Sequence, residues 1–137
     1  TYQTKIGGDY QDSFYKLARA RYYFELNNYR KAIDLLIVLK SEDAVTTLRI
    51  KMLLLRCQYK NGEERTEIID EIKTYRHRLK HHKKLTPSFL KGYINFFSVF
   101  ILLLQNKPVS VLRAKLDKYL ELANKNWLLE EIALHDK

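Results

Sequence analysis

The chain contains 137 residues, of which 46% are hydrophobic and 30% are charged, and its formal net charge is +9. This size and composition are ordinary for one soluble globular domain with a hydrophobic core. The single cysteine, Cys57, excludes an internal disulfide, and the positive charge favours contact with nucleic acid, an anionic membrane or an acidic protein. Four glycines and two prolines leave few places to turn, so we expect an all-α fold with six or seven helices.

The N-terminal part of the chain predicts a lead-in followed by two amphipathic helices. Residues 1–11 contain Gly7-Gly8 and no hydrophobic periodicity, which predicts a flexible segment. Asp12 is expected to cap a helix over 12–27, which Asn27-Asn28 separates from a second helix over 29–40. The two apolar stripes consist of Phe14, Leu17, Ala20 and Phe24 in the first helix and Ala32, Ile33, Leu36 and Leu39 in the second.

Two further helices are predicted in the middle of the chain. Ser41 is a capping hydroxyl for a helix that extends to about Lys60, where Asn61-Gly62 provides a left-handed stop. A fourth helix is expected over about 63–82. Its apolar stripe consists of Ile68, Ile72, Tyr75 and Leu79.

The C-terminal part begins with the clearest start signal, Thr86-Pro87, which predicts a fifth helix to about Gln105. Its apolar run over 92–106 falls short of the roughly 20 residues that cross a bilayer, so we expect a buried core helix and no membrane span. Asn106-Lys107-Pro108 then opens a sixth helix. Its aligned residues are Leu112, Leu116, Tyr119 and Ala123. A terminal helix over 126–136 is expected, either as a continuation or as a new helix capped by Asn124 or Asn126.

The helices fall into pairs, and the breaks within the first two pairs, at Asn28 and Gly62, are 34 residues apart. A period of this length is typical of a helical solenoid. The first pair resembles the tetratricopeptide repeat (TPR) family at Ala20, Tyr23, Tyr29, Ala32 and Leu36. In the third pair, Ser98 and Ser110 occupy the two small positions. Small residues on both helices allow the backbones to approach where they cross.

The resemblance implies antiparallel helix pairs stacked as a short TPR-like right-handed solenoid. The pairs are expected over about 12–40, 42–84 and 86–126, followed by the terminal helix, in one domain over 12–137. An unrelated helical bundle is the alternative. The start at Thr1, without an initiator Met, is consistent with a piece of a longer protein.

A TPR-like array implies a concave face, on which such solenoids bind extended peptides or partner helices. The positions that match the family's groove are Leu17, Arg21, Lys51, Leu55, Asn95 and Val99. The resemblance therefore implies a non-enzymatic protein–protein interaction or scaffold module with a protein or peptide partner.

The sharpest charge feature is "KTYRHRLKHHKK", residues 73–84, which contains three His and no acidic residue. Its six cations are Lys73, Arg76, Arg78, Lys80, Lys83 and Lys84. The segment is either a surface for nucleic acid or another polyanion, or the solvated end of a helix, where cations favour the dipole. His77 and His81 have metal-ligand spacing, but no Cys, Asp or Glu nearby completes a site.

No motif for catalysis or cofactor binding stands out, so we expect no enzyme activity, no cofactor and no metal. Cys57 is expected to be a buried structural residue. Trp127, Leu128 and Ile132 either fill the core or form a contact with another copy of the chain. The lone cysteine and the lack of a signal peptide or membrane span in this chain favour a cytoplasmic location.

Overall fold

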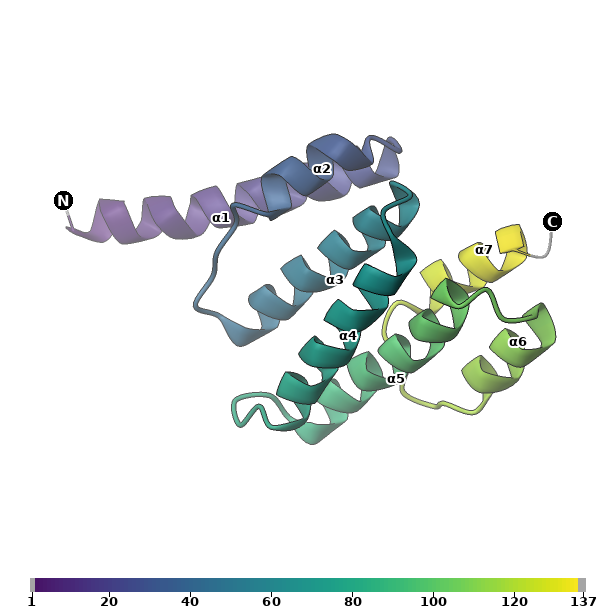
Figure 1. Cartoon of the computed structure of the whole chain (residues 1–137). Helices are drawn as coiled ribbons and strands as arrows, with labels where there is room; N and C mark the ends of the chain where they lie inside the picture. The colour runs from purple at the N-terminus through teal and green to yellow at the C-terminus, as the bar shows by residue number, and fades with distance from the viewer. Residues whose placement is uncertain (1, 136–137) are drawn as a thin grey trace. The chain divides into compact units, whose positions relative to one another are not determined.

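The computed structural model describes the backbone of residues 2–135 and the side chains of residues 12–135 (Figure 1). Residues 2–135 contain seven α-helices and no β-strand, which confirms the all-α class. The chain divides into two compact units, residues 1–63 and 64–137, and each is described by itself. The boundary lies inside the helix pair that the sequence predicts over 42–84.

The first unit contains α1 (Tyr2–Glu25), α2 (Tyr29–Leu36) and α3 (Ala44–Lys60). α2 runs back along α1 after a short turn and packs against both α1 and α3 (Figure 1). Ala20 and Ala32 are both fully buried, as their predicted inner positions require, whereas Phe14 is exposed and does not belong to the apolar stripe.

The start of α1 differs from the sequence prediction, because the helix already includes residues 2–11, which we expected to be a flexible lead-in. Gly7 and Gly8 each cost about 1 kcal/mol relative to Ala inside a helix, which disfavours a helix without forbidding it. Two glycines within a continuous helix of 24 residues are therefore tolerated.

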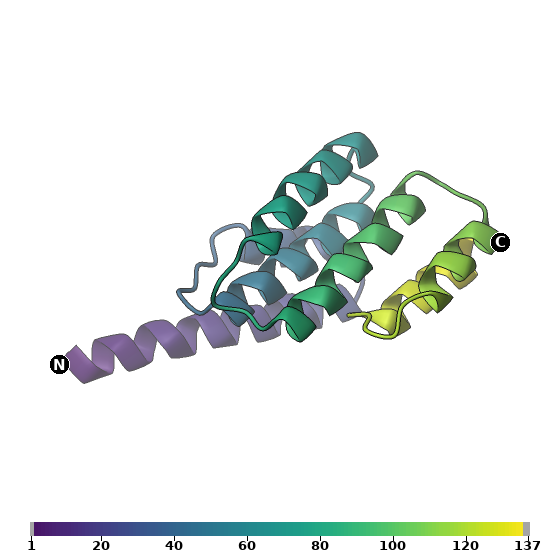
Figure 2. The ribbon, with the colours of Figure 1, turned by 90° about the horizontal axis from the view of Figure 1, so that it is seen from below.

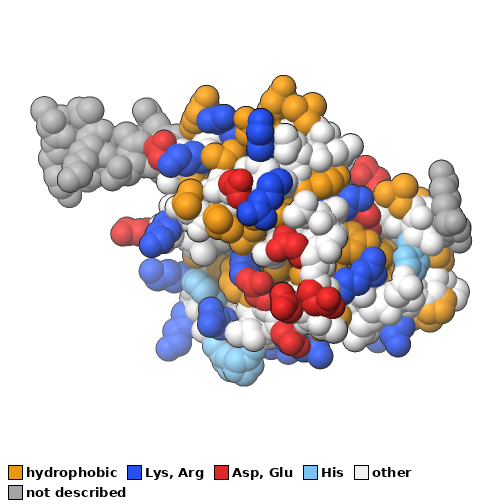
Figure 3. Space-filling model, turned by 45° about the horizontal axis from the view of Figure 1, so that its top comes forward, with side chains coloured by type: hydrophobic (Ala, Val, Ile, Leu, Met, Phe, Trp, Pro, Cys, Tyr) orange, Lys and Arg blue, Asp and Glu red, His pale blue; other side chains and the backbone are white. Residues whose placement is uncertain are grey.

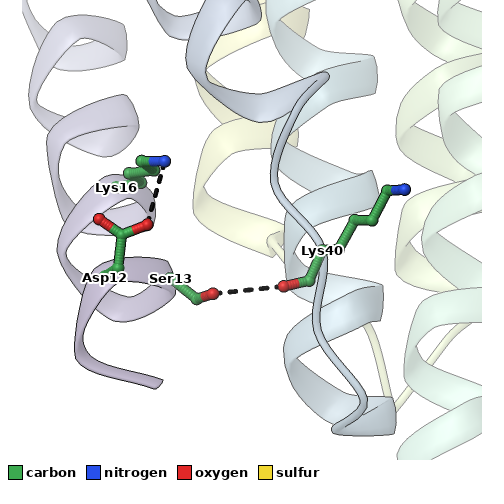
Figure 4. A network of polar contacts seen from close by, with 4 residues as sticks. All are labelled: Asp12, Ser13, Lys16 and Lys40. Atoms are coloured by element: carbon green, nitrogen blue, oxygen red, sulfur yellow. Dashed lines mark hydrogen bonds and ion pairs between the residues drawn. The ribbon is translucent and has the colours of Figure 1, made fainter. Parts of the chain in front are cut away.

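The connection from α2 to α3 is held by polar contacts rather than by further helix. α2 ends at Leu36, four residues earlier than predicted. The Ser13 hydroxyl donates a hydrogen bond to the Lys40 carbonyl at 3.3 Å, and an ion pair of 3.0 Å joins Lys16 to Asp12 on α1 (Figure 4). The bond between Ser13 and Lys40 ties the segment after α2 to α1, whereas the ion pair lies within α1.

Asp43, rather than Ser41, caps α3. Its Oδ2 accepts a hydrogen bond from the Thr46 backbone N–H at 2.8 Å and from the Thr46 hydroxyl at 2.6 Å. These hydrogen bonds lower the pKa of the Asp43 carboxyl. The Ser41 hydroxyl instead accepts a hydrogen bond from the backbone N–H of Asp43, the residue that precedes α3.

Left-handed residues mark the helix breaks. In the described part of the chain the residues with positive φ are Asn27, Gly62, Asn106 and Asn124. Asn and Gly adopt this conformation more readily than other residues. The breaks predicted at Asn27-Asn28, Asn61-Gly62 and Asn106 are thereby confirmed.

The second unit contains α4 (Arg65–Lys80), α5 (Pro87–Leu104), α6 (Val109–Asp117) and α7 (Lys125–His135). α5 packs against the other three helices (Figure 2). Its start is confirmed, since the Thr86 Oγ1 accepts a hydrogen bond from the Phe89 N–H with Pro87 in the first turn. By length and composition α5 is apolar enough to cross a membrane, and half of its residues are buried inside the structure.

Aromatic rings form much of the core of this unit. Phe96 and Phe100 are fully buried, and their ring centroids lie 6.0 and 5.4 Å from that of Trp127 on α7. Leu128 and Ile132 are buried as well. These three residues of α7 therefore fill the core of the unit, rather than forming an exposed apolar face for self-association.

The sixth helix is shorter than predicted, because α6 ends at Asp117 and Ala123 lies outside it. The Asn95 Nδ2 donates a hydrogen bond to the Glu121 carbonyl at 2.9 Å, and the Ala123 N–H donates to the Gly92 carbonyl at 3.0 Å. These bonds to α5 satisfy backbone groups that a longer α6 would have paired internally. α7 then starts as a new helix after Asn124.

Candidate interaction surfaces

The predicted peptide groove is mostly buried. The exposed fraction is 0% for Leu55 and Val99, 7% for Leu17 and 8% for Asn95. Side chains with so little exposure fill the interior and do not line an open groove. The predicted groove therefore loses four of its six members. Sequence spacing already contained the signal, since Leu17 lies three residues before Ala20, on the same apolar stripe.

The polar members of the predicted groove differ in their surroundings. Arg21 is exposed and Lys51 is half-buried in the first unit. In the second unit the Asn95 amide donates a hydrogen bond to the Glu121 carbonyl, so this side chain is already engaged within its own unit.

The third pair does not repeat the alanine contact of the first. Ser98 is half-buried and its hydroxyl donates to the Ile94 carbonyl at 3.2 Å, while the Arg76 Nη1 donates to the Ser98 Oγ at 3.4 Å. Ser98 thus contacts α4. Ser110 is exposed, so the interpretation of Ser98 and Ser110 as a recurring crossing point is wrong.

Exposed cations occupy the second half of α4 and the segment after it. We call these five side chains the basic surface: Lys73, Arg78, Lys80, Lys83 and Lys84. The ion pairs between described side chains involve none of them. Arg76, the sixth predicted cation, is half-buried against Ser98. Figure 3 shows Lys and Arg side chains beside a group of His side chains at the lower edge of one face.

The charge distribution along α4 favours this arrangement. Its acids, Glu67, Asp70 and Glu71, lie in its first half, and its cations lie mainly towards its C-terminal end, where the helix dipole is negative. Tyr75 is half-buried and packs edge-on against Phe97, at 6.1 Å between ring centroids, and burial raises its pKa. The basic surface thus has charge but no open aromatic ring.

The histidines of this segment contact each other. The rings of His77 and His81 lie 5.0 Å apart, and both side chains are exposed. The described residues contain no group of three His, Cys, Asp or Glu that could hold a metal ion.

Cys57 is fully buried, as predicted, and burial raises the pKa of its thiol to about 12.

We expect the Cys57 thiol of the folded protein to react far more slowly with iodoacetamide at pH 8 than that of the protein unfolded in guanidinium chloride. Buried thiols are shielded, and a pKa rise from 9.0 to about 12 lowers the thiolate fraction about a thousandfold. Mass spectrometry of timed samples measures both rates. Equal rates would mean that Cys57 is accessible in the folded chain.

One further feature was not predicted from the sequence. We call it the tyrosine–arginine cluster: Tyr15, Arg19 and Tyr23 on α1 with Lys31 on α2. The Arg19 guanidinium carbon lies 5.7 Å from the ring centroids of both tyrosines, and its Nη2 donates to the Tyr23 hydroxyl at 3.1 Å. The Lys31 Nζ lies 5.5 Å from the Tyr23 centroid. The spacing of four residues between Tyr15, Arg19 and Tyr23 was the available signal.

The cluster has an electrostatic consequence. The hydrogen bond from Arg19 and its positive charge lower the pKa of the Tyr23 phenol, with a further contribution from Lys31. The neighbouring cations Lys16 and Arg30 form ion pairs with Asp12 and Asp34. The ion pairs between described side chains involve neither Arg19 nor Lys31.

The fold places the chain among all-α proteins. Comparison with protein-family models, curated proteins and solved structures finds no match to the chain.

Proposed function

We propose that the protein is a non-enzymatic interaction module that binds an acidic segment of a partner protein through the basic surface. One observation carries this proposal: five exposed Lys and Arg side chains lie between the middle of α4 and the segment that follows it, without an acidic partner among the described side chains. Such a surface attracts an opposite charge and accelerates encounter with it.

The architecture supports a protein partner. Ala20 on α1 and Ala32 on α2 are fully buried, and the two helices pack against each other, which supports a TPR-like helix pair in the first unit. Because four of the six groove residues are buried, we place the binding surface on the charged end of α4 instead. With Tyr75 half-buried, this surface recognises charge without base stacking, which favours an acidic peptide over a single nucleic-acid strand.

The test uses a fluorescent peptide of ten glutamates and the variant Lys80→Gln/Lys83→Gln/Lys84→Gln. We expect about tenfold weaker binding in fluorescence anisotropy, since each partly screened charge contributes about 0.5 kcal/mol. Wild-type binding is also expected to weaken as salt rises.

The matched control is Lys107→Gln/Lys118→Gln/Lys125→Gln, which removes the same charge from exposed positions elsewhere in the second unit. It is expected to change affinity less than twofold. Equal losses in the two variants would show attraction by net charge alone and would contradict the proposed surface. Tighter binding of a DNA duplex than of the peptide would contradict the choice of partner.

A further inference from the structure

The tyrosine–arginine cluster combines open aromatic rings with positive charge. The side chain of Tyr15 is 60% exposed, and that of its neighbour Tyr22 is 61% exposed. The centroids of the Tyr22 and Tyr23 rings lie 5.9 Å apart, so Tyr22 extends the cluster along α1. Two large, solvent-facing rings therefore belong to this part of α1: Tyr15 contacts Arg19 directly, and Tyr22 contacts the Tyr23 ring that Arg19 also contacts. In the upper part of the face in Figure 3, apolar and basic side chains are interspersed.

Both cations of the cluster contact its aromatic rings. Arg19 lies over the rings of Tyr15 and Tyr23, and its Nη2 donates a hydrogen bond to the Tyr23 hydroxyl. Lys31 lies against the same Tyr23 ring from α2. Neither cation forms an ion pair with a carboxylate of the described side chains, so both retain attraction for an external anion.

We propose that this cluster binds single-stranded nucleic acid, with bases stacked on Tyr15 and Tyr22 and phosphates attracted by Arg19 and Lys31. Proteins that bind single strands combine aromatic rings, on which any base can stack, with cations that follow the backbone. Arg adds a planar group that itself stacks on bases. The proposal rests on the first unit and is independent of the basic surface, which lacks an open ring.

A duplex is a poor ligand for this site. Its bases are already stacked on one another and cannot lie on a tyrosine without being unpaired. The cluster is therefore expected to prefer a single strand over the same sequence in a duplex, whereas attraction by charge alone would favour the duplex for its higher charge density.

The experiment measures fluorescence anisotropy of labelled 12-nucleotide strands of uridine and of deoxythymidine at low salt. We expect Tyr15→Leu/Tyr22→Leu to weaken binding at least fivefold, which corresponds to the loss of about 1 kcal/mol of stacking. Arg19→Gln is expected to weaken binding and to make it less sensitive to salt. The variants replace exposed side chains, and unchanged thermal unfolding verifies their folding.

Phe14→Leu is the matched control, since Phe14 is an exposed ring on α1 outside the cluster. An equal loss with Phe14→Leu would overturn the assignment, as would absence of binding at low salt or stronger binding of the duplex. Lys80→Gln/Lys83→Gln/Lys84→Gln is expected to leave strand binding within twofold. Conversely, Tyr15→Leu/Tyr22→Leu is expected to leave binding of the glutamate peptide unchanged. The measurements can therefore contradict either proposal without contradicting the other.

Discussion

Replacement of Phe100 by alanine is expected to lower the free energy of unfolding by about 3–5 kcal/mol. The Phe100 side chain is fully buried on α5. The centroid of its ring lies 5.4 Å from that of Phe96 and 5.4 Å from that of Trp127. Its removal loses the transfer free energy of the ring and leaves a cavity in a close-packed core. Since domains are stable by only about 5–15 kcal/mol, this loss is a large part of the total.

Urea unfolding measures the loss, with fluorescence of the single Trp127 reporting on the second unit and circular dichroism on all helices. The control is Leu120→Ala, because Leu120 is fully exposed in the segment between α6 and α7. It is expected to change stability by less than about 0.5 kcal/mol. Similar losses in the two variants would mean that Phe100 does not lie in a packed core.

The helices were predictable where the local signal and the tertiary structure agree. Thr86-Pro87 supplies both a capping hydroxyl and a proline that tolerates the first turn, so the start of α5 follows from two adjacent residues. The helix ends at Asn27 and Gly62 were predictable as well, because the left-handed conformation there depends on the type of one residue. The end of α6 at Asp117 depends on bonds to α5 from residues more than twenty positions away, which no local pattern contains.

The candidate sites were less predictable, because site residues were assigned from family positions rather than from burial. Leu55 and Val99 are apolar, and burying such a side chain contributes about 1.5–3 kcal/mol, so the core competes strongly for them. The cations of residues 73–84 could be located from sequence, since charged side chains seldom leave water. The contacts of Arg19 with two tyrosine rings could not be predicted in the same way, because they depend on the rotamers of three side chains.

Replacement of Ala32 by leucine tests the contact on which the TPR-like interpretation depends. Ala20 on α1 and Ala32 on α2 each have 0% exposure, and the two helices pack against each other. Added methylenes force the side chains off their rotamers or push the helices apart, which costs about 1–3 kcal/mol. We expect a loss of this size for Ala32→Leu and for Ala20→Leu in urea unfolding. Ala18→Leu, at an exposed position of α1, is expected to change stability by less than about 0.5 kcal/mol.

The double variant Ala20→Leu/Ala32→Leu distinguishes a shared contact from two separate ones. If the two alanines face each other at the helix crossing, the first leucine already separates the backbones, and the second costs less than it does alone. The losses should then differ from additivity by more than about 0.5 kcal/mol. Additive losses would place the alanines against different neighbours. The close approach of α1 and α2 would then lose its explanation, and the first unit would be better described as an ordinary helical bundle.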